Sequence, residues 1–257
     1  MKKIAFLLIL SIVAISCNND DDDCCNNPPT NAAISFKFTQ NWGTTAVTPS
    51  NYNTNVFENT AGNYVSISRL RYLISRIELH KADGTTVAFD EYQLVDLADA
   101  NSLTLTPALS ATTGDYTGIS FVYGFNEEDN VSGAYPDLND ASWNWPSMLG
   151  GGYHFMQMDG SFDDENGMPQ PYNFHNGTAR VSDGVFEQNF IAFEFDQDFT
   201  INDDATIEIK MDISEWYKNP LTWDLNDRSV DLMMNYLAQK DINRNGKTVF
   251  SIGEITQ

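Results

Sequence analysis

Basic residues and cysteine are scarce in this chain of 257 residues. It has 14 Lys and Arg against 36 Asp and Glu, and a formal net charge of −22 at pH 7. Because nucleic acids are bound through clustered cations, this balance argues against a nucleic-acid partner. All three Cys lie within the first 25 residues, so we expect the rest of the chain to fold without a disulfide or a thiolate.

Motifs of common enzyme classes are also missing. The sequence has no G-x-S-x-G elbow, no H-E-x-x-H, no phosphate-binding loop and no paired-glycine dinucleotide fingerprint. Acidic pairs such as Glu127 and Glu128 say little about glycoside hydrolysis in a chain with 36 acidic residues. We therefore expect a binding protein rather than an enzyme.

The N-terminus has the features of a lipoprotein leader. An apolar run over residues 4–15 follows a short cationic start and is too short to span a bilayer as a permanent helix. Small residues directly before Cys17 resemble a bacterial lipobox, which predicts a signal peptide over residues 1–16 and a covalent lipid on Cys17. An ordinary signal peptide with an incidental Cys17 is the alternative.

Residues 17–31 are polar and acidic, and this composition predicts a flexible tether. The run Asp20–Asp23 resembles the surface-export signal of some Gram-negative lipoproteins, and a plain solvated spacer explains it as well. We expect an outer-membrane lipoprotein, held to the membrane by its lipid, on the periplasmic or the cell-surface side.

Residues 32–257 are predicted to form one all-β domain, an antiparallel β-sandwich with one or two short helices. Apolar and polar residues alternate through many short segments separated by turn residues, as expected for half-buried strands. The strongest strand prediction is Ala205–Ile213, where apolar residues occupy every odd position. Helical segments are predicted at 213–217 and at 228–239, the second opened by Asp227 as its N-cap. The other predicted strands are 34–38, 64–68, 70–80, 87–89, 92–97, 118–123, 153–158 and 190–195.

Histidine is the expected transition-metal ligand in a cysteine-free body. His80 ends a predicted strand before a turn, where a solvated side chain is the simplest interpretation. His154 follows three glycines, which let another group approach the backbone closely. An extended chain here would place His154, Met156 and Met158 on one face, a set of donors that suits Cu(I), although Met on a sheet face commonly fills a core. His175 lies at a hairpin-like distance that would bring it opposite His154.

Several segments resemble the MbnP-like domain family. They occur in order along the body, at residues 67–79, 143–146, 151–155, 174–177 and 249–253. Members of this family are extracytoplasmic and β-rich, and some bind copper with His together with a tryptophan that a partner dihaem enzyme oxidises to kynurenine. The resemblance therefore implies a β-rich fold and a copper-associated function in metal uptake or handling.

Only particular positions carry this resemblance to a site. It implies that His154 and His175 face the metal site and that Trp143 or Trp145 is the oxidised side chain. A dihaem maturation enzyme or an outer-membrane transporter would be the partner. Two alternatives stay open at this point. In one, the Trp pair plugs one end of the sandwich. In the other, the protein is a surface lipoprotein that binds a glycan or a protein through aromatic loops, with structural His.

Acidic segments raise the question of a hard cation. Residues 241–246 copy the first half of a calcium loop, but its twelfth position is Ile252, where a bidentate Glu is required. We therefore predict a turn that ends a helix and leads into a strand. The carboxylates of Asp159, Asp163, Asp164 and Glu165 are interpreted as part of a solvated loop, with a cation site as the alternative.

Overall fold

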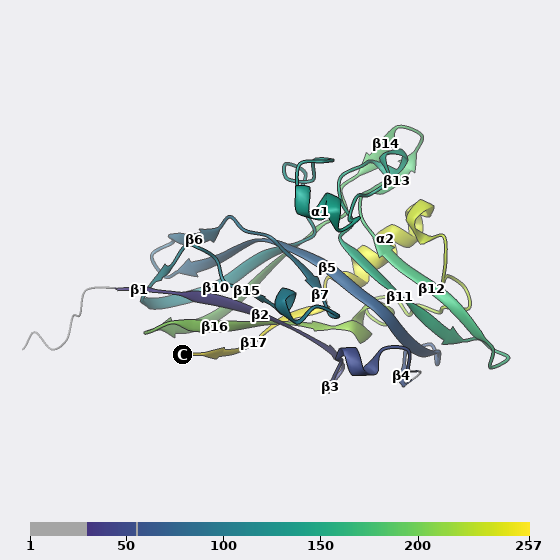
Figure 1. Ribbon diagram of the computed structural model, residues 1–257, viewed down its shortest axis with the longest axis horizontal. Coiled ribbons are helices and arrows are strands. Elements are labelled where there is room, and N and C mark those ends of the chain that lie inside the picture. The colour runs from purple at the N-terminus through teal and green to yellow at the C-terminus, as the bar shows by residue number, and fades with distance from the viewer. Residues whose placement is uncertain (1–29, 55) are drawn as a thin grey trace, which may run out of the picture.

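The computed structural model describes residues 30–54 and 56–257 (Figure 1). The predicted signal peptide, the lipid on Cys17 and nearly all of the predicted tether lie outside the described residues. Asn31, the last residue assigned to the tether, pairs with Thr112 in the short pair β1 (Asn31–Ala32) and β9 (Ala111–Thr112). No helix in the described ranges has the length and hydropathy needed to span a bilayer.

Two sheets face each other across one large hydrophobic core, so the predicted sandwich-like, mostly antiparallel β fold is confirmed. The larger sheet has the order β12-β11-β5-β10-β15, with β4, β6 and β7 also paired to β5. The smaller sheet has the order β17-β16-β2-β3, with β8 on β2, and its β2–β16 pair is parallel. Figure 1 shows β2, β16 and β17 layered beneath β10 and β15.

The bounds of the strands and helices are as follows. The larger sheet contains β4 (Phe57–Glu58), β5 (Tyr64–Lys81), β6 (Thr86–Phe89), β7 (Gln93–Asp96), β10 (Gly114–Tyr123), β11 (Met156–Asp163), β12 (Pro169–Asn176) and β15 (Ile191–Ile201). The smaller sheet contains β2 (Ile34–Trp42), β3 (Thr45–Ala46), β8 (Thr104–Leu105), β16 (Ala205–Asp212) and β17 (Phe250–Thr256). A separate hairpin is formed by β13 (Ala179–Ser182) and β14 (Val185–Glu187), and the α-helices are α1 (Pro136–Asp140) and α2 (Tyr236–Gly246). Short 3-10 helices lie at Pro49–Asn51, Ala100–Leu103, Ser147–Leu149, Ile213–Tyr217 and Leu232–Met234.

The alternation in the sequence produces the core directly. In β16, Ala205, Ile207, Ile209 and Met211 are buried while the residues between them are partly exposed, which confirms the predicted strand. Burying one such aliphatic side chain contributes about 1.5–3 kcal/mol. The strand ends at Asp212, whose side chain accepts a hydrogen bond from the backbone N–H of Ser214 and so caps the predicted helical turn.

The predicted helix at residues 228–239 is wrong in position. Only Leu232–Met234 form a 3-10 turn there, and the α-helix begins at Tyr236, where Asn235 accepts a hydrogen bond from the backbone N–H of Ala238. A cap of this kind fixes the start of a helix more strongly than the apolar stripe that suggested an earlier one. The stripe itself is largely exposed, at 56% for Met234 and 67% for Leu237.

The calcium-loop pattern lies within helix α2, which ends at Gly246, and strand β17 follows from Phe250. The predicted order, a helix end followed by a strand, is therefore correct, but residues 241–246 are the last part of the helix and the turn comes after them. Asp241 forms ion pairs with Arg228 and Arg244 at 2.7 Å and 2.9 Å, so its carboxylate serves to hold the helix.

Candidate metal site

His154 and His175 meet at one end of the β11–β12 hairpin. In the antiparallel register Gln157 lies opposite His175, so His175 is near the end of β12 and His154 just precedes the start of β11. The two imidazole ring centroids are 5.4 Å apart, with an angle of 84° between the ring planes. The structure thus brings together the two side chains whose spacing suggested a hairpin.

The glycines before His154 allow the chain itself to pack closely. Gly152 has a φ of 81°, and a Cβ there would collide with the side chain of Asn130. Asn130 in turn accepts a hydrogen bond from the backbone N–H of Tyr153 at 2.9 Å. The backbone N–H of His154 donates to the carbonyl of Trp143 at 2.9 Å. The group that approaches this glycine-rich segment is therefore a neighbouring loop, which fixes the backbone that carries His154.

Both candidate tryptophans contact His154. The ring centroids of Trp143 and Trp145 lie 5.4 Å and 4.8 Å from that of His154, and both indoles are buried. The guanidinium of Arg71 lies 4.9 Å from the Trp143 ring, in a cation–π arrangement. Trp145 fits because Gly177 has no side chain, since a Cβ there would come within 2.6 Å of the indole.

His154 is held neutral with an unused ring nitrogen. The residue is 6% exposed, and its buried Nδ1 has no hydrogen-bond partner. Burial, followed by the nearby charges of His175, Arg69 and Arg71, lowers the pKa of His154 to about 3. The ring is therefore uncharged at neutral pH, and a neutral imidazole with a free lone pair is the form that binds a transition metal.

His175 is held by a carboxylate. Its Nε2 lies 2.8 Å from Oδ1 of Asp159, which also accepts a hydrogen bond from Asn173 Nδ2 at 2.7 Å. Arg69 Nε donates to the other oxygen of Asp159 at 2.5 Å. Burial alone would raise the pKa of Asp159, but the hydrogen bonds from His175 and Asn173 and the charge of Arg69 lower it to about 2. The carboxylate is therefore ionised over the whole physiological range.

Helix α2 supports the same strand end through one amide. The Nε2 of Gln239 donates to the carbonyl of His175 at 2.8 Å and to the carbonyl of Leu232 at 3.1 Å. Its Oε1 accepts a hydrogen bond from the backbone N–H of Gly177 at 3.2 Å, and the side chain is fully buried. The backbone of His175 is thus tied to the C-terminal helix.

Met156 and Met158 do not share a face with the His pair, so that expectation was wrong. The chain bends at Phe155, and β11 begins only at Met156, so the two-residue period does not extend back to His154. Within the strand Gln157 points to the same side as His175, whereas both Met point into the core and are 0% exposed. His80 is placed elsewhere, on β5, with its Nε2 2.8 Å from Oγ of Ser120.

The sequence reasoning missed Asp159, Arg69 and Asn173 as parts of this site. Arg69 on β5 and Asn173 on β12 both lie opposite Asp159 in register, so three adjacent strands bring these side chains together. The alternation of polar and apolar residues from Arg69 to Tyr72 was the available signal. Within the described residues no group of three or more His, Cys, Asp or Glu side chains is arranged to hold a metal, so the candidate donors are two imidazoles.

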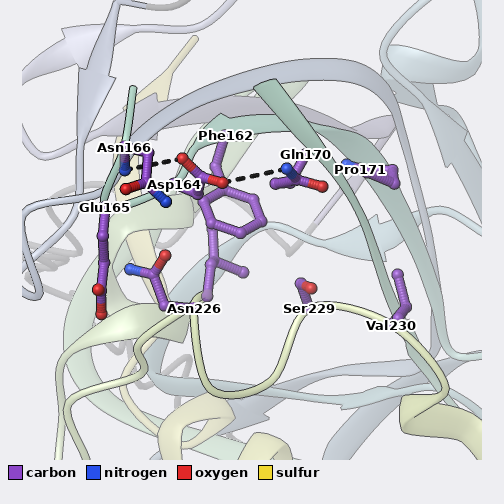
Figure 2. A pocket seen from close by; sticks show the side chains of 10 residues that line it. Phe162, Asp164, Glu165, Asn166, Gln170, Pro171, Asn226, Ser229 and Val230 are labelled. Carbon is purple, nitrogen blue, oxygen red and sulfur yellow. Dashed lines mark hydrogen bonds between the residues drawn. The ribbon is translucent and has the colours of Figure 1, made fainter. Parts of the chain in front are cut away.

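The far end of the same hairpin carries a polar cavity of about 450 Å³, shown in Figure 2. Asp164 there accepts hydrogen bonds from the backbone N–H groups of Asn166 and Met168, both at 2.9 Å, and from Gln170 Nε2 at 3.1 Å. Its carboxylate therefore closes the turn between β11 and β12. Asp159 belongs to the His pair instead, so the acidic residues predicted to share one loop are divided between the two ends.

Comparisons with known proteins agree with this architecture. The family model MbnP matches residues 31–234. A solved structure, MbnP from Methylosinus trichosporium, is similar with a TM-score of 0.56 and 15% sequence identity, and the match covers 87% of this chain and 99% of that one. No curated protein sequence matches significantly. The structural likeness at this identity concerns the fold.

Proposed function

This chain belongs to the MbnP family, and from that premise we propose that it binds copper through His154 and His175 and acts in metal uptake or handling rather than in catalysis. The family is associated with copper-uptake systems. Imidazole nitrogen is a donor that copper accepts readily, whereas calcium and magnesium prefer oxygen ligands.

One observation carries the proposal: Nδ1 of His154 has no hydrogen-bond partner although the residue is only 6% exposed. Buried polar atoms are almost always hydrogen-bonded, and an unpaired one costs about 1–3 kcal/mol. A second imidazole lies 5.4 Å away, measured between ring centroids. A metal ion would satisfy this one unpaired nitrogen, with the second imidazole close by. When bound, copper would supply a redox-active centre at this end of the sheet.

Copper titration of the purified protein tests the proposal directly. Replacing both residues, His154→Ala with His175→Ala, is expected to abolish high-affinity copper binding, while the matched variant His80→Ala retains it because His80 lies elsewhere on β5. Elemental analysis of protein purified from its own host provides the second measurement. Unchanged copper affinity in the double variant would refute the proposal.

We further propose that Trp143 or Trp145 is the side chain oxidised in this family, with a dihaem enzyme as the maturing partner. Both indoles contact His154, as an oxidised residue beside a metal ligand would have to do. Mass spectrometry of the host-derived protein is the test. The expected change is an addition of oxygen or a loss of carbon on a peptide that contains these residues, and five intact tryptophans would contradict it.

The membrane location is proposed from the leader sequence. Cys17 carries the lipid that anchors the protein to the outer membrane, where a transporter would be its partner. We expect the protein with its native sequence to incorporate labelled fatty acid, and the Cys17→Ser variant to incorporate none. Labelling that persists in the variant would contradict the anchor.

The glycan-binding alternative is not our proposal. Recognition of a sugar by aromatic loops requires exposed ring faces, and Trp143 and Trp145 are 0% and 2% exposed. Their faces are occupied by His154, by Arg71 and by the backbone at Gly177.

A further inference from the structure

We propose that Asp159 decides which ring nitrogen of His175 carries the proton: it holds His175 as the Nε2–H tautomer and leaves Nδ1 as the nitrogen with a free lone pair. The tautomer follows from the hydrogen bonds alone. The consequence for a metal, namely that His175 would bind it through Nδ1, rests on the proposed function.

Both oxygens of Asp159 accept hydrogen bonds. Asp159 Oδ1 lies 2.8 Å from His175 Nε2, and the same oxygen accepts a hydrogen bond from Asn173 Nδ2 at 2.7 Å. The other oxygen accepts a charge-assisted bond from Arg69 Nε at 2.5 Å. A carboxylate surrounded by donors is ionised and can only accept, so the proton between Asp159 and His175 belongs to the imidazole.

The contact between Asp159 and His175 is held by neighbouring strands. Asp159 is on β11, Arg69 is its register partner on β5, and Asn173 is its register partner on β12. The side chains of Asp159 and His175 are 12% and 13% exposed, so water competes little for their bond. The contact is therefore built into the centre of three hydrogen-bonded strands rather than into a loop.

The other imidazole is held without a carboxylate. His154 Nδ1 is buried without a partner, and its ring meets that of His175. A histidine that binds a metal through one nitrogen commonly donates its other N–H to a carboxylate, which fixes the ring and makes the ligand more basic. Asp159 occupies that position for His175, whereas His154 is placed by its packing between two indoles. Asp159 is accordingly a positioning residue.

The test is nitrogen-15 NMR of the histidine ring nitrogens in the metal-free protein at neutral pH. The expected pattern for His175 is a protonated Nε2 and a bare Nδ1. Asp159→Asn removes the anionic acceptor, and we expect it to yield a mixture of the two tautomers. Asp164→Asn is the matched control on the same hairpin, where the carboxylate bonds to the turn, and it should leave the His175 signals unchanged.

Copper titration of the same samples addresses the metal. Asp159→Asn should lower copper affinity by about 10–100-fold, the range found when a carboxylate partner of a metal-bound His is lost, and Asp164→Asn should leave it unchanged. A His175 that carries its proton on Nδ1 in the unmodified protein overturns the inference, even if copper binds. The Nε2–H tautomer without any copper binding supports the role of Asp159 and refutes the proposed function instead. The measurement on the unmodified chain decides the tautomer even if the variant does not fold.

Discussion

The two ends of the β11–β12 hairpin differ in how they use the same kinds of residue. At the end with the His pair, Asp159 bonds to side chains from the two neighbouring strands, β5 and β12, and stands beside a His with an unpaired nitrogen. At the turn end, Asp164 bonds to its own turn and borders a solvent-accessible cavity. Hydrogen bonds keep the pKa of both carboxylates below the ordinary value. A lowered pKa therefore does not distinguish the candidate metal site from an ordinary turn.

The largest expected contrast between the ends is in packing. Trp143→Ala would open a cavity beside His154 and remove the surface on which Arg71 rests, so we expect a loss of about 3–5 kcal/mol in the free energy of unfolding. Asn226→Ala, at the exposed rim of the far cavity, should change it by less than about 0.5 kcal/mol. Urea unfolding monitored by circular dichroism measures both. Equal losses in the free energy of unfolding for the two variants would contradict this prediction.

The next contrast is in pH dependence. The pKa of His154 is lowered from 6.5 to about 3, so the folded state keeps this ring neutral while the unfolded chain takes up a proton below pH 6.5. The stabilisation is complete above that pH and is lost as the pH falls toward 3. Between pH 7 and pH 5 the metal-free protein should lose about 2 kcal/mol from this group.

Comparing the slope of stability against pH in the unmodified chain and in His154→Gln isolates this effect. We expect a shallower slope in His154→Gln, and the slope in Asp164→Asn should match that of the unmodified chain over this range. Asp159 does not interfere, because the stability it contributes is lost only between its ordinary pKa of 3.8 and its lowered value of about 2. Parallel slopes in all three proteins would show that His154 is not held neutral.

The smallest contrast compares two glycines. Gly177→Ala would push a Cβ against Trp145, and overpacking of this kind costs about 1–3 kcal/mol. Gly167 lies in the turn between β11 and β12, with a φ of 71° and nothing within 4 Å of an added Cβ, so Gly167→Ala is expected to cost only backbone strain of about 1 kcal/mol. Thermal unfolding and tryptophan fluorescence distinguish them. Only Gly177→Ala should shift the emission, since it alone displaces an indole.

The sequence predicted the parts of this molecule that depend on local pattern. The alternation in Ala205–Ile213 and the hairpin spacing of His154 and His175 both correspond to what the structure shows. The bend at Phe155 was not visible in the pattern, and it put Met156 and Met158 in the core. The misplaced helix has a similar cause, because the cap at Asn235 outweighed an apolar stripe.

The contacts of Asp159 could not be predicted because they depend on strand register. Arg69 lies 90 residues from Asp159 in the chain. A shift of one residue in the β5–β11 or the β11–β12 pairing would turn the partner side chain to the other face of the sheet. Hydrophobic alternation fixes which face of β5 is buried, but it does not say which residue of β11 lies opposite. The two imidazoles could therefore be anticipated from spacing, whereas the carboxylate that orients one of them required the structure.

The amide of Gln239 has a mechanical consequence. It bonds at once to the carbonyl of His175, the backbone N–H of Gly177 and the carbonyl of Leu232, and it lies beyond residue 234, where the family match ends. A force applied to helix α2 would be transmitted through this side chain to the end of β12 that bears His175. A displacement of that helix would therefore change the distance between the two histidine rings.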